Sequence, residues 1–126
     1  FVTCFDLIKD TPTKEEWELI ARRPIAEKTL IRAKRKNLPL YNLKPTKSQL
    51  TPETYLFTAP GISYPPNDWG IYNLIGNVAE LVAEEGIVKG GHWHTPADEA
   101  KWDADFPDET PNSTTGFRCV CEIISP

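Results

Sequence analysis

The clearest periodic pattern in the chain lies between residues 13 and 22. Its apolar positions share one helical face and are Trp17, Ile20 and Ala21. Thr13 stands before the pattern and Glu16 follows three residues later, which is the spacing of a capping box at a helix N-terminus. Pro24 cannot continue a helix. The pattern therefore predicts a helix from about Lys14 to Arg22 with its Trp17 face in the core.

The segments on either side of this helix carry weaker patterns. Residues 1–9 are typical of the end of a preceding helix. Residues 24–57 show little periodicity, which predicts a long irregular loop. A structureless loop of this length is uncommon inside a compact domain, so we expect something to organise it.

The second half of the chain predicts short strands joined by turns. Pro65–Asp68 is a turn signal, and Glu84–Gly86 favours a hairpin turn between residues 81 and 88. Ile87–Lys89 predicts a short strand, and Phe117–Ile123 alternates as a closing strand would. The acidic, proline-bearing stretch His94–Thr115 predicts a loop.

Between these halves, residues 70–80 concentrate polar side chains within a short span. The polar and permissive positions are Asn73, Gly76, Asn77 and Glu80. All the candidate ligand atoms are oxygen, which suits a hard cation such as calcium rather than zinc or copper. An Asn/Gly turn between two strands explains the same residues equally well.

Length and composition fit one domain over residues 1–126. The chain is 40% hydrophobic and 25% charged, which is ordinary for a globular protein. Twelve prolines and the lack of any long apolar run indicate a loop-rich fold without a membrane-spanning segment.

Charge is unevenly distributed along the chain. Residues 22–47 hold nine Lys or Arg and a single acid, whereas residues 80–126 hold ten Asp or Glu and three Lys or Arg. A basic run can bind nucleic acid, but this one lacks interleaved aromatic residues and any RNA-binding motif. It favours a solvated face or a partner-docking surface, and we expect no nucleic-acid partner.

Several short motifs occur in a characteristic order. They are Pro12-Thr13-Lys14-Glu15-Glu16-Trp17, Thr58-Ala59-Pro60, Asp68-Trp69-Gly70-Ile71-Tyr72-Asn73, Gly76-Asn77-Val78-Ala79-Glu80, Lys89-Gly90-Gly91-His92-Trp93 and Gly116-Phe117-Arg118-Cys119. This order resembles the formylglycine-generating enzyme family, also called sulfatase-modifying factors. The resemblance implies an α+β fold of C-type lectin-like type, rich in loops, with short strands and few helices. It covers only the later part of such a domain, which predicts a fragment of a longer chain or a reduced domain.

The three cysteines are Cys4, Cys119 and Cys121, so at least one is unpaired within the chain. In the family, a cysteine eight residues before the first proline motif pairs with the cysteine of Gly-Phe-Arg-Cys. The resemblance therefore implies a Cys4–Cys119 disulfide and an oxidising compartment. Three reduced, buried cysteines are the alternative.

The resemblance also implies calcium as a cofactor at two sites. The better-matched site would use the side chains of Asn73 and Glu80 with the carbonyls of Gly76 and Val78. A second set, with Glu53 where the family has Asp, would be Asn42, Leu43, Glu53 and Tyr55. A surface loop with incidental polar residues explains the second set equally well.

The positions that carry the catalytic cysteine pair in the family are Thr95 and Ala100 here. Neither residue can act as a thiolate, so we do not expect formylglycine formation or any catalytic residue of that reaction. His92 and His94 have a known metal-ligand spacing, but two ligands do not complete a catalytic site. We expect His92, Trp93 and His94 to line a groove instead.

The function that the resemblance implies is a non-catalytic, calcium-braced scaffold or protein-docking domain of a bacterial envelope protein or lipoprotein. Similar motif combinations occur in gliding-motility and type 9 secretion components, so the expected place is the periplasm, outer membrane or cell surface. The expected partners are other envelope proteins, and membrane attachment would come only through an upstream lipid anchor. Two alternatives stay open: an enzyme of the superfamily with an altered active site, and a lectin-like ligand-binding module.

Overall fold

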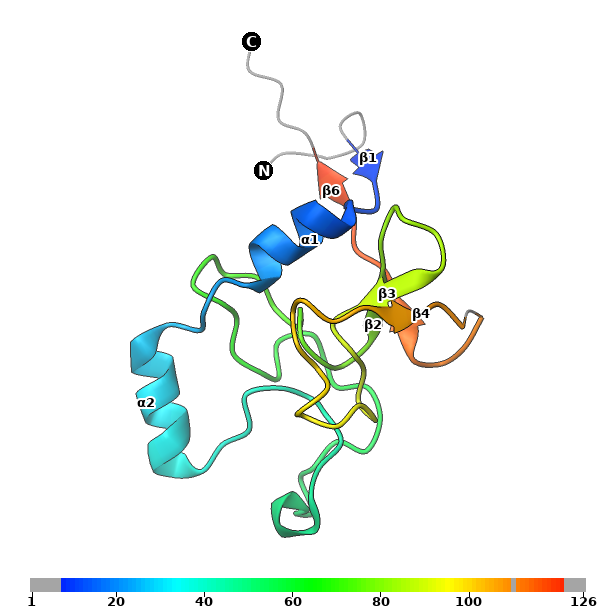
Figure 1. Ribbon diagram of the computed structural model, residues 1–126. Coiled ribbons are helices and arrows are strands. Elements are labelled where there is room, and N and C mark those ends of the chain that lie inside the picture. The colour runs from blue at the N-terminus through cyan, green and yellow to red at the C-terminus, as the bar shows by residue number, and fades with distance from the viewer. Residues whose placement is uncertain (1–7, 110, 122–126) are drawn as a thin grey trace.

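The computed structural model describes residues 8–109 and 111–121, which form two small sheets and two α-helices separated by long loops (Figure 1). In chain order the elements are β1 (Ile8–Asp10), α1 (Lys14–Ala21), α2 (Glu27–Lys36), a 3₁₀ turn η2 (Lys47–Gln49), β2 (Ala79–Leu81), β3 (Ile87–Lys89), β4 (Phe106–Pro107), β5 (Thr115–Gly116) and β6 (Val120–Cys121). Most of the described chain is therefore loop, as the composition predicts.

The four-stranded sheet has the order β4-β3-β2-β5, with β2 antiparallel to β3 and parallel to β5. Glu80 in β2 lies opposite Lys89 in β3, so the Gly-Asn-Val-Ala-Glu and Lys-Gly-Gly motifs are neighbours. The predicted strand Ile87–Lys89 and the hairpin that precedes it are confirmed. Separately, β1 pairs with β6, which joins the two ends of the described chain (Figure 1).

Helix α1 forms because its first turn is capped and its inner face is apolar. The Glu16 backbone N–H donates to Thr13 Oγ1 at 3.2 Å, and the Thr13 N–H donates back to the Glu16 carboxylate, so the predicted capping box is confirmed. Trp17 is only 1% exposed and forms the core with Ala21, Leu74 and Val82. The core therefore lies between α1, the loop before β2 and the end of β2.

Four predictions about elements need correction. Residues 8–10 form a strand rather than the end of a helix, because they pair with residues 120–121 near the other end of the described chain. Residues 1–7 of the predicted helix end are not among the described residues. The predicted irregular loop 24–57 contains α2, which escapes the periodicity test because Ala33 is its one buried residue. The closing strand is limited to Val120–Cys121 within the described residues, and the predicted loop 94–115 includes β4.

None of the helices in the described ranges is both long enough and apolar enough to cross a membrane.

Gly90 lets the end of β3 pass close to the core. Its φ is +88°, and a Cβ there would overlap the Leu74 carbonyl oxygen and press on the Trp17 ring. Gly86 has a similar φ of +84°, but a Cβ there would meet open space. Alanine substitutions at the two glycines would therefore share the cost of a positive φ, and only the one at Gly90 would add steric overlap.

We predict that Gly90→Ala destabilises the fold by about 2 kcal/mol more than Gly86→Ala, because both bear the cost of a positive φ and only the first overpacks the core. Urea unfolding of the two variants and the parent chain measures this difference. Equal losses of free energy in the two variants would contradict the close packing at Gly90.

Candidate functional site

The loop before β2 holds an unusual backbone conformation. Asn73, Gly76 and Asn77 have φ values of 55°, 77° and 66°, in the left-handed region that Gly and Asn tolerate best. A Cβ at Gly76 would lie 2.5 Å from the Asn42 carbonyl oxygen, so glycine is required where these two segments form a β-bridge. The loop is thus tightly wound and pressed against the segment around Asn42.

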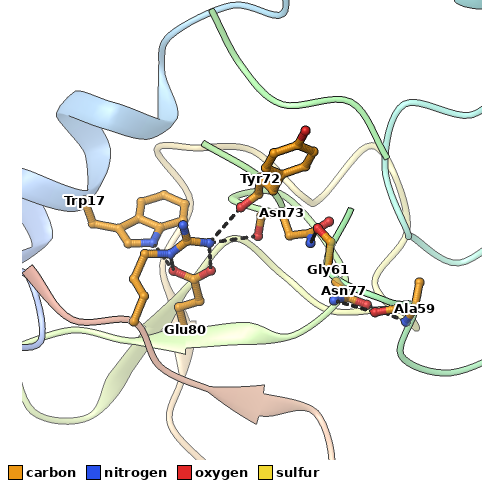
Figure 2. A network of polar contacts seen from close by, with 8 residues as sticks. Trp17, Ala59, Gly61, Tyr72, Asn73, Asn77 and Glu80 are labelled. Atoms are coloured by element: carbon orange, nitrogen blue, oxygen red, sulfur yellow. Dashed lines mark hydrogen bonds and ion pairs between the residues drawn. The ribbon is translucent and has the colours of Figure 1, made fainter. Parts of the chain in front are cut away.

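Two buried or partly buried amides hold this loop to its neighbours. The Asn77 backbone N–H donates to the Asn42 carbonyl at 2.8 Å, and the Asn42 side-chain amide donates to Asn77 Oδ1 at 3.0 Å and to the Phe57 carbonyl at 2.8 Å. The Asn77 side chain also accepts from the Ala59 N–H at 2.8 Å, as Figure 2 shows. These bonds organise the long irregular segment that sequence periodicity left unexplained.

The Glu80 carboxylate is buried and receives three hydrogen bonds from two side chains. Trp17 Nε1 and Arg118 Nε donate to Oε2 at 2.8 and 2.7 Å, and Arg118 Nη2 donates to Oε1 at 2.5 Å. The same Nη2 donates to the carbonyls of Tyr72 and Asn73 at 2.9 and 3.4 Å (Figure 2). The Arg118 guanidinium therefore bridges β2 and the wound loop.

This arrangement bears on the calcium site predicted at Asn73, Gly76, Val78 and Glu80. The Asn73 amide nitrogen donates to the Gly61 carbonyl at 2.7 Å, so its Oδ1 is left as an acceptor (Figure 2). A carboxylate has about four acceptor positions, and Arg118 and Trp17 use three of those on Glu80. The oxygen donors fit calcium only as an ion that shares Glu80 with Arg118, and binding there stays a prediction.

The residues of the second predicted calcium site, Asn42, Leu43, Glu53 and Tyr55, differ in their burial. The Asn42 amide is only 2% exposed and is engaged by Phe57 and Asn77, whereas Glu53 and Tyr55 are exposed. The Tyr55 ring packs edge-on against Tyr64, with ring centroids 6.4 Å apart. Within the described residues no side-chain hydrogen bond or ion pair joins Asn42 to Glu53, and Leu43 is half-buried. Calcium at this set also stays a prediction.

The positions of the family's cysteine pair are both buried. The Thr95 hydroxyl accepts from the His92 N–H at 2.9 Å, and the Thr95 carbonyl accepts from the Lys44 N–H at 3.0 Å. Ala100 is 8% exposed. In the described ranges, moreover, no cluster of three or more His, Cys, Asp or Glu could hold a metal ion. Thr95 therefore acts here as a turn-forming residue.

A cavity of about 180 Å³ lies beside β2, β3 and β4, and His92 is the histidine that lines it. Its lining also includes Glu109, Asn112 and Thr115. Burial, and then the nearby His94, lower the pKa of His92, and His92 Nδ1 accepts from the His94 N–H at 3.1 Å. Together these favour a neutral imidazole with its proton on Nε2.

The three residues expected to line a groove have neighbouring rings, with the Trp93 ring centroid 6.0 Å from that of His92 and 5.5 Å from that of His94. Only His92 faces the cavity; Trp93 packs edge-on against Phe57, with ring centroids 4.9 Å apart, and His94 is exposed. A groove shared by the three residues stays a prediction.

Sequence reasoning missed the buried cation Lys89. Its ammonium is fully buried, 2.7 Å from Glu18 and 2.9 Å from Asp105, and lies over the Trp17 ring. Hydrogen bonds from Lys14 and Lys89 lower the pKa of Asp105. Lys89 ends a predicted strand and precedes two glycines, which indicates close packing at this point. Nothing in the local sequence indicates that Glu18 and Asp105 are its partners.

The predicted Cys4–Cys119 disulfide cannot be placed, since Cys4 lies outside the described residues. Cys119 and Cys121 are both exposed, and Cys119 has no disulfide partner among residues 8–109 and 111–121. The pairing of β1 with β6 does bring the two ends of the described chain together. The disulfide stays a prediction.

We predict that Arg118→Gln destabilises the fold by about 3 kcal/mol, because it leaves the buried Glu80 charge without its cation. Arg23→Gln is the matched control, since Arg23 forms the same two-point pair with Asp68 at a more exposed position and should cost under about 1 kcal/mol. Chemical denaturation of both variants measures the difference. A loss at position 118 no larger than at 23 would contradict the central place of Glu80.

Comparison of the chain with known proteins identifies its family. The chain matches the model of the sulfatase-modifying factor enzyme 1-like domain over residues 7–123. It is 30% identical over 133 aligned positions to the inactive C-alpha-formylglycine-generating enzyme 2 of Bos taurus, covering 89% of this chain and 44% of that protein.

Two solved structures share the fold. CarF is 24% identical with a TM-score of 0.63, covering 91% of this chain and 47% of CarF. Treponema denticola variable protein 1 is 23% identical with a TM-score of 0.60, covering 89% and 47%. The chain spans less than half the length of each of these three relatives. The predicted loop-rich α+β fold class is confirmed, and the chain belongs to the sulfatase-modifying factor enzyme 1-like domain family.

Proposed function

We propose that this chain is a non-catalytic docking domain built on the scaffold of formylglycine-generating enzymes. The observation that carries the proposal is the replacement of the family's cysteine pair by Thr95 and Ala100, both buried. Thiol oxidation needs a thiolate to hold metal or substrate, and neither side chain can supply one. The relative from Bos taurus carries the word inactive in its name, which is consistent with family members that lack the reaction.

The rest of the site supports a structural role. The Asn42–Asn77 and Glu80–Arg118 contacts hold loops in place, and a fixed set of loops on a small sheet is well suited to present a recognition surface. The motif combination favours a bacterial envelope protein, at the periplasm, outer membrane or cell surface. There the domain would dock other envelope proteins, in an assembly of the gliding-motility or type 9 secretion kind.

A second candidate function is binding or altered chemistry at the His92 cavity. Its volume of about 180 Å³ admits only a small molecule, and a neutral His92 beside Glu109 could bind or move one proton. This cavity also keeps open a lectin-like ligand-binding role. The docking proposal is preferred because the described residues include no cluster of three or more His, Cys, Asp or Glu that could hold a catalytic metal there.

We predict that the purified chain leaves a sulfatase-type Cys-x-Pro-x-Arg peptide unmodified in the presence of copper and oxygen. Mass spectrometry of the peptide gives the result, since conversion of cysteine to formylglycine lowers its mass by about 18 Da. An active formylglycine-generating enzyme on the same peptide is the positive control. Conversion that depends on this chain would overturn the docking proposal and favour an enzyme.

Calcium bracing is the part of the proposal that rests on Asn73 and Glu80. We predict that millimolar calcium raises the melting temperature by several degrees relative to chelator, because an ion that binds only the folded state stabilises it. Asn73→Gly should abolish this increment, since it removes the amide ligand while glycine tolerates the positive φ.

The matched control is Asn37→Gly, which changes another positive-φ asparagine at the C-terminal end of α2 and should keep the whole increment. Calorimetry of the three chains with and without calcium tests the prediction. If calcium does not change the melting temperature of the parent chain, calcium bracing is wrong, and Arg118 is the cation that pairs with Glu80 in this region.

A further inference from the structure

Helix α2 is the most strongly charged element of the molecule and lies at its edge, away from the four-stranded sheet (Figure 1). It carries five Lys or Arg and one Glu over ten residues, in a chain whose formal net charge is −4. Ala33 is its one buried residue. The other nine side chains of α2 are at least partly exposed and therefore form its outer surface.

The exposed cations form one face. Lys28, Arg32 and Lys36 follow one another at intervals of four residues, about 6 Å apart along the axis, and Arg35 lies beside them. We call these four residues the cationic face. On a helical wheel Lys28, Arg32 and Arg35 lie roughly 100° or more from Ala33, which packs inward, and Lys36 is the member of the face nearest to Ala33.

These charges are not neutralised within the fold. Across the described ranges, the ion pairs use Lys14, Arg23, Lys89 and Arg118, and none uses a cation of α2. Surface charges act over about 8 Å at physiological ionic strength, so the cationic face acts locally whatever the net charge of the chain. It is suited to an anionic surface that approaches α2.

The composition of α2 helps to identify that surface. A helix that docks in a protein groove presents apolar anchors three, four and seven residues apart, and the cationic face presents none. Aromatic residues that would stack on nucleic-acid bases are also absent from α2. Exposed Ile31 lies next to Arg35 on the helix surface and exposed Leu38 follows the helix, which is the mixture found where helices rest on lipid headgroups.

We propose that the cationic face of α2 docks on an anionic phospholipid bilayer as a reversible, peripheral contact. The charges would bind headgroup phosphates, while Ile31 and Leu38 reach the interface between headgroups and acyl chains. This inference stands on α2 alone and holds whether or not the domain also docks proteins. Each Lys or Arg near such a surface strengthens binding about fivefold.

The experiment is co-sedimentation of the purified chain with large unilamellar vesicles of 3:7 phosphatidylglycerol to phosphatidylcholine, and with pure phosphatidylcholine vesicles. We expect binding to the anionic vesicles only, weakened by high salt. The triple variant K28Q/R32Q/K36Q should bind about a hundredfold more weakly, while circular dichroism shows an intact fold because Gln is also a good helix former.

The matched control is K44Q/K47Q/K101Q, which removes three exposed lysines outside α2 and the same net charge. It should bind within a few-fold of the parent chain, and the charge-preserving K28R/R32K/K36R should bind normally. Failure of the parent chain to bind anionic vesicles overturns the proposal, as does an equal loss in the control variant. Binding to duplex DNA or a polyglutamate peptide without binding to vesicles overturns it in favour of those classes of partner.

Discussion

The structure depends on one buried carboxylate. Glu80 lies in β2, receives the indole N–H of Trp17 from α1, and is held at both oxygens by Arg118 from the segment before β6. Burying a charge is costly unless it is paired and fully hydrogen-bonded, and each partner here comes from a different part of the chain. The pair therefore fixes the relative position of helix, sheet and closing segment in a fold with very short strands.

Around this pair, side-chain amides hold loop segments together, a role that backbone hydrogen bonds between strands have in more regular folds. Asn42 and Asn77 bond to each other and to the backbone at residues 57 and 59, so a long stretch without strands keeps a defined course. Glycines at 76 and 90 permit the close approaches that these contacts need. The scaffold of the family is thus retained, although the positions of its reactive cysteines hold Thr95 and Ala100.

The proposed function rests on the retained scaffold and on the residues that replace the family's cysteine pair. Thr95 closes a turn with His92, and His92 lines a small cavity with its imidazole biased to the neutral form. The strongest unpaired feature is instead the cationic face of α2, at the edge of the molecule (Figure 1). The proposals for this domain rest on these two features, a tightly bonded centre and a charged outer helix.

The sequence by itself determined whatever depends on local order: the capped helix with Trp17 inward, the strand Ile87–Lys89, the family, and the absence of the cysteine pair. Tertiary structure alone decided what depends on distant partners. It assigned Glu80 to Arg118, 38 residues away, buried Lys89 against Glu18, and turned residues 8–10 into a strand by pairing them with residues 120–121. Helix α2 was missed for a related reason, since periodicity detects a helix only where one face meets a core, and α2 turns nearly all of its side chains to solvent.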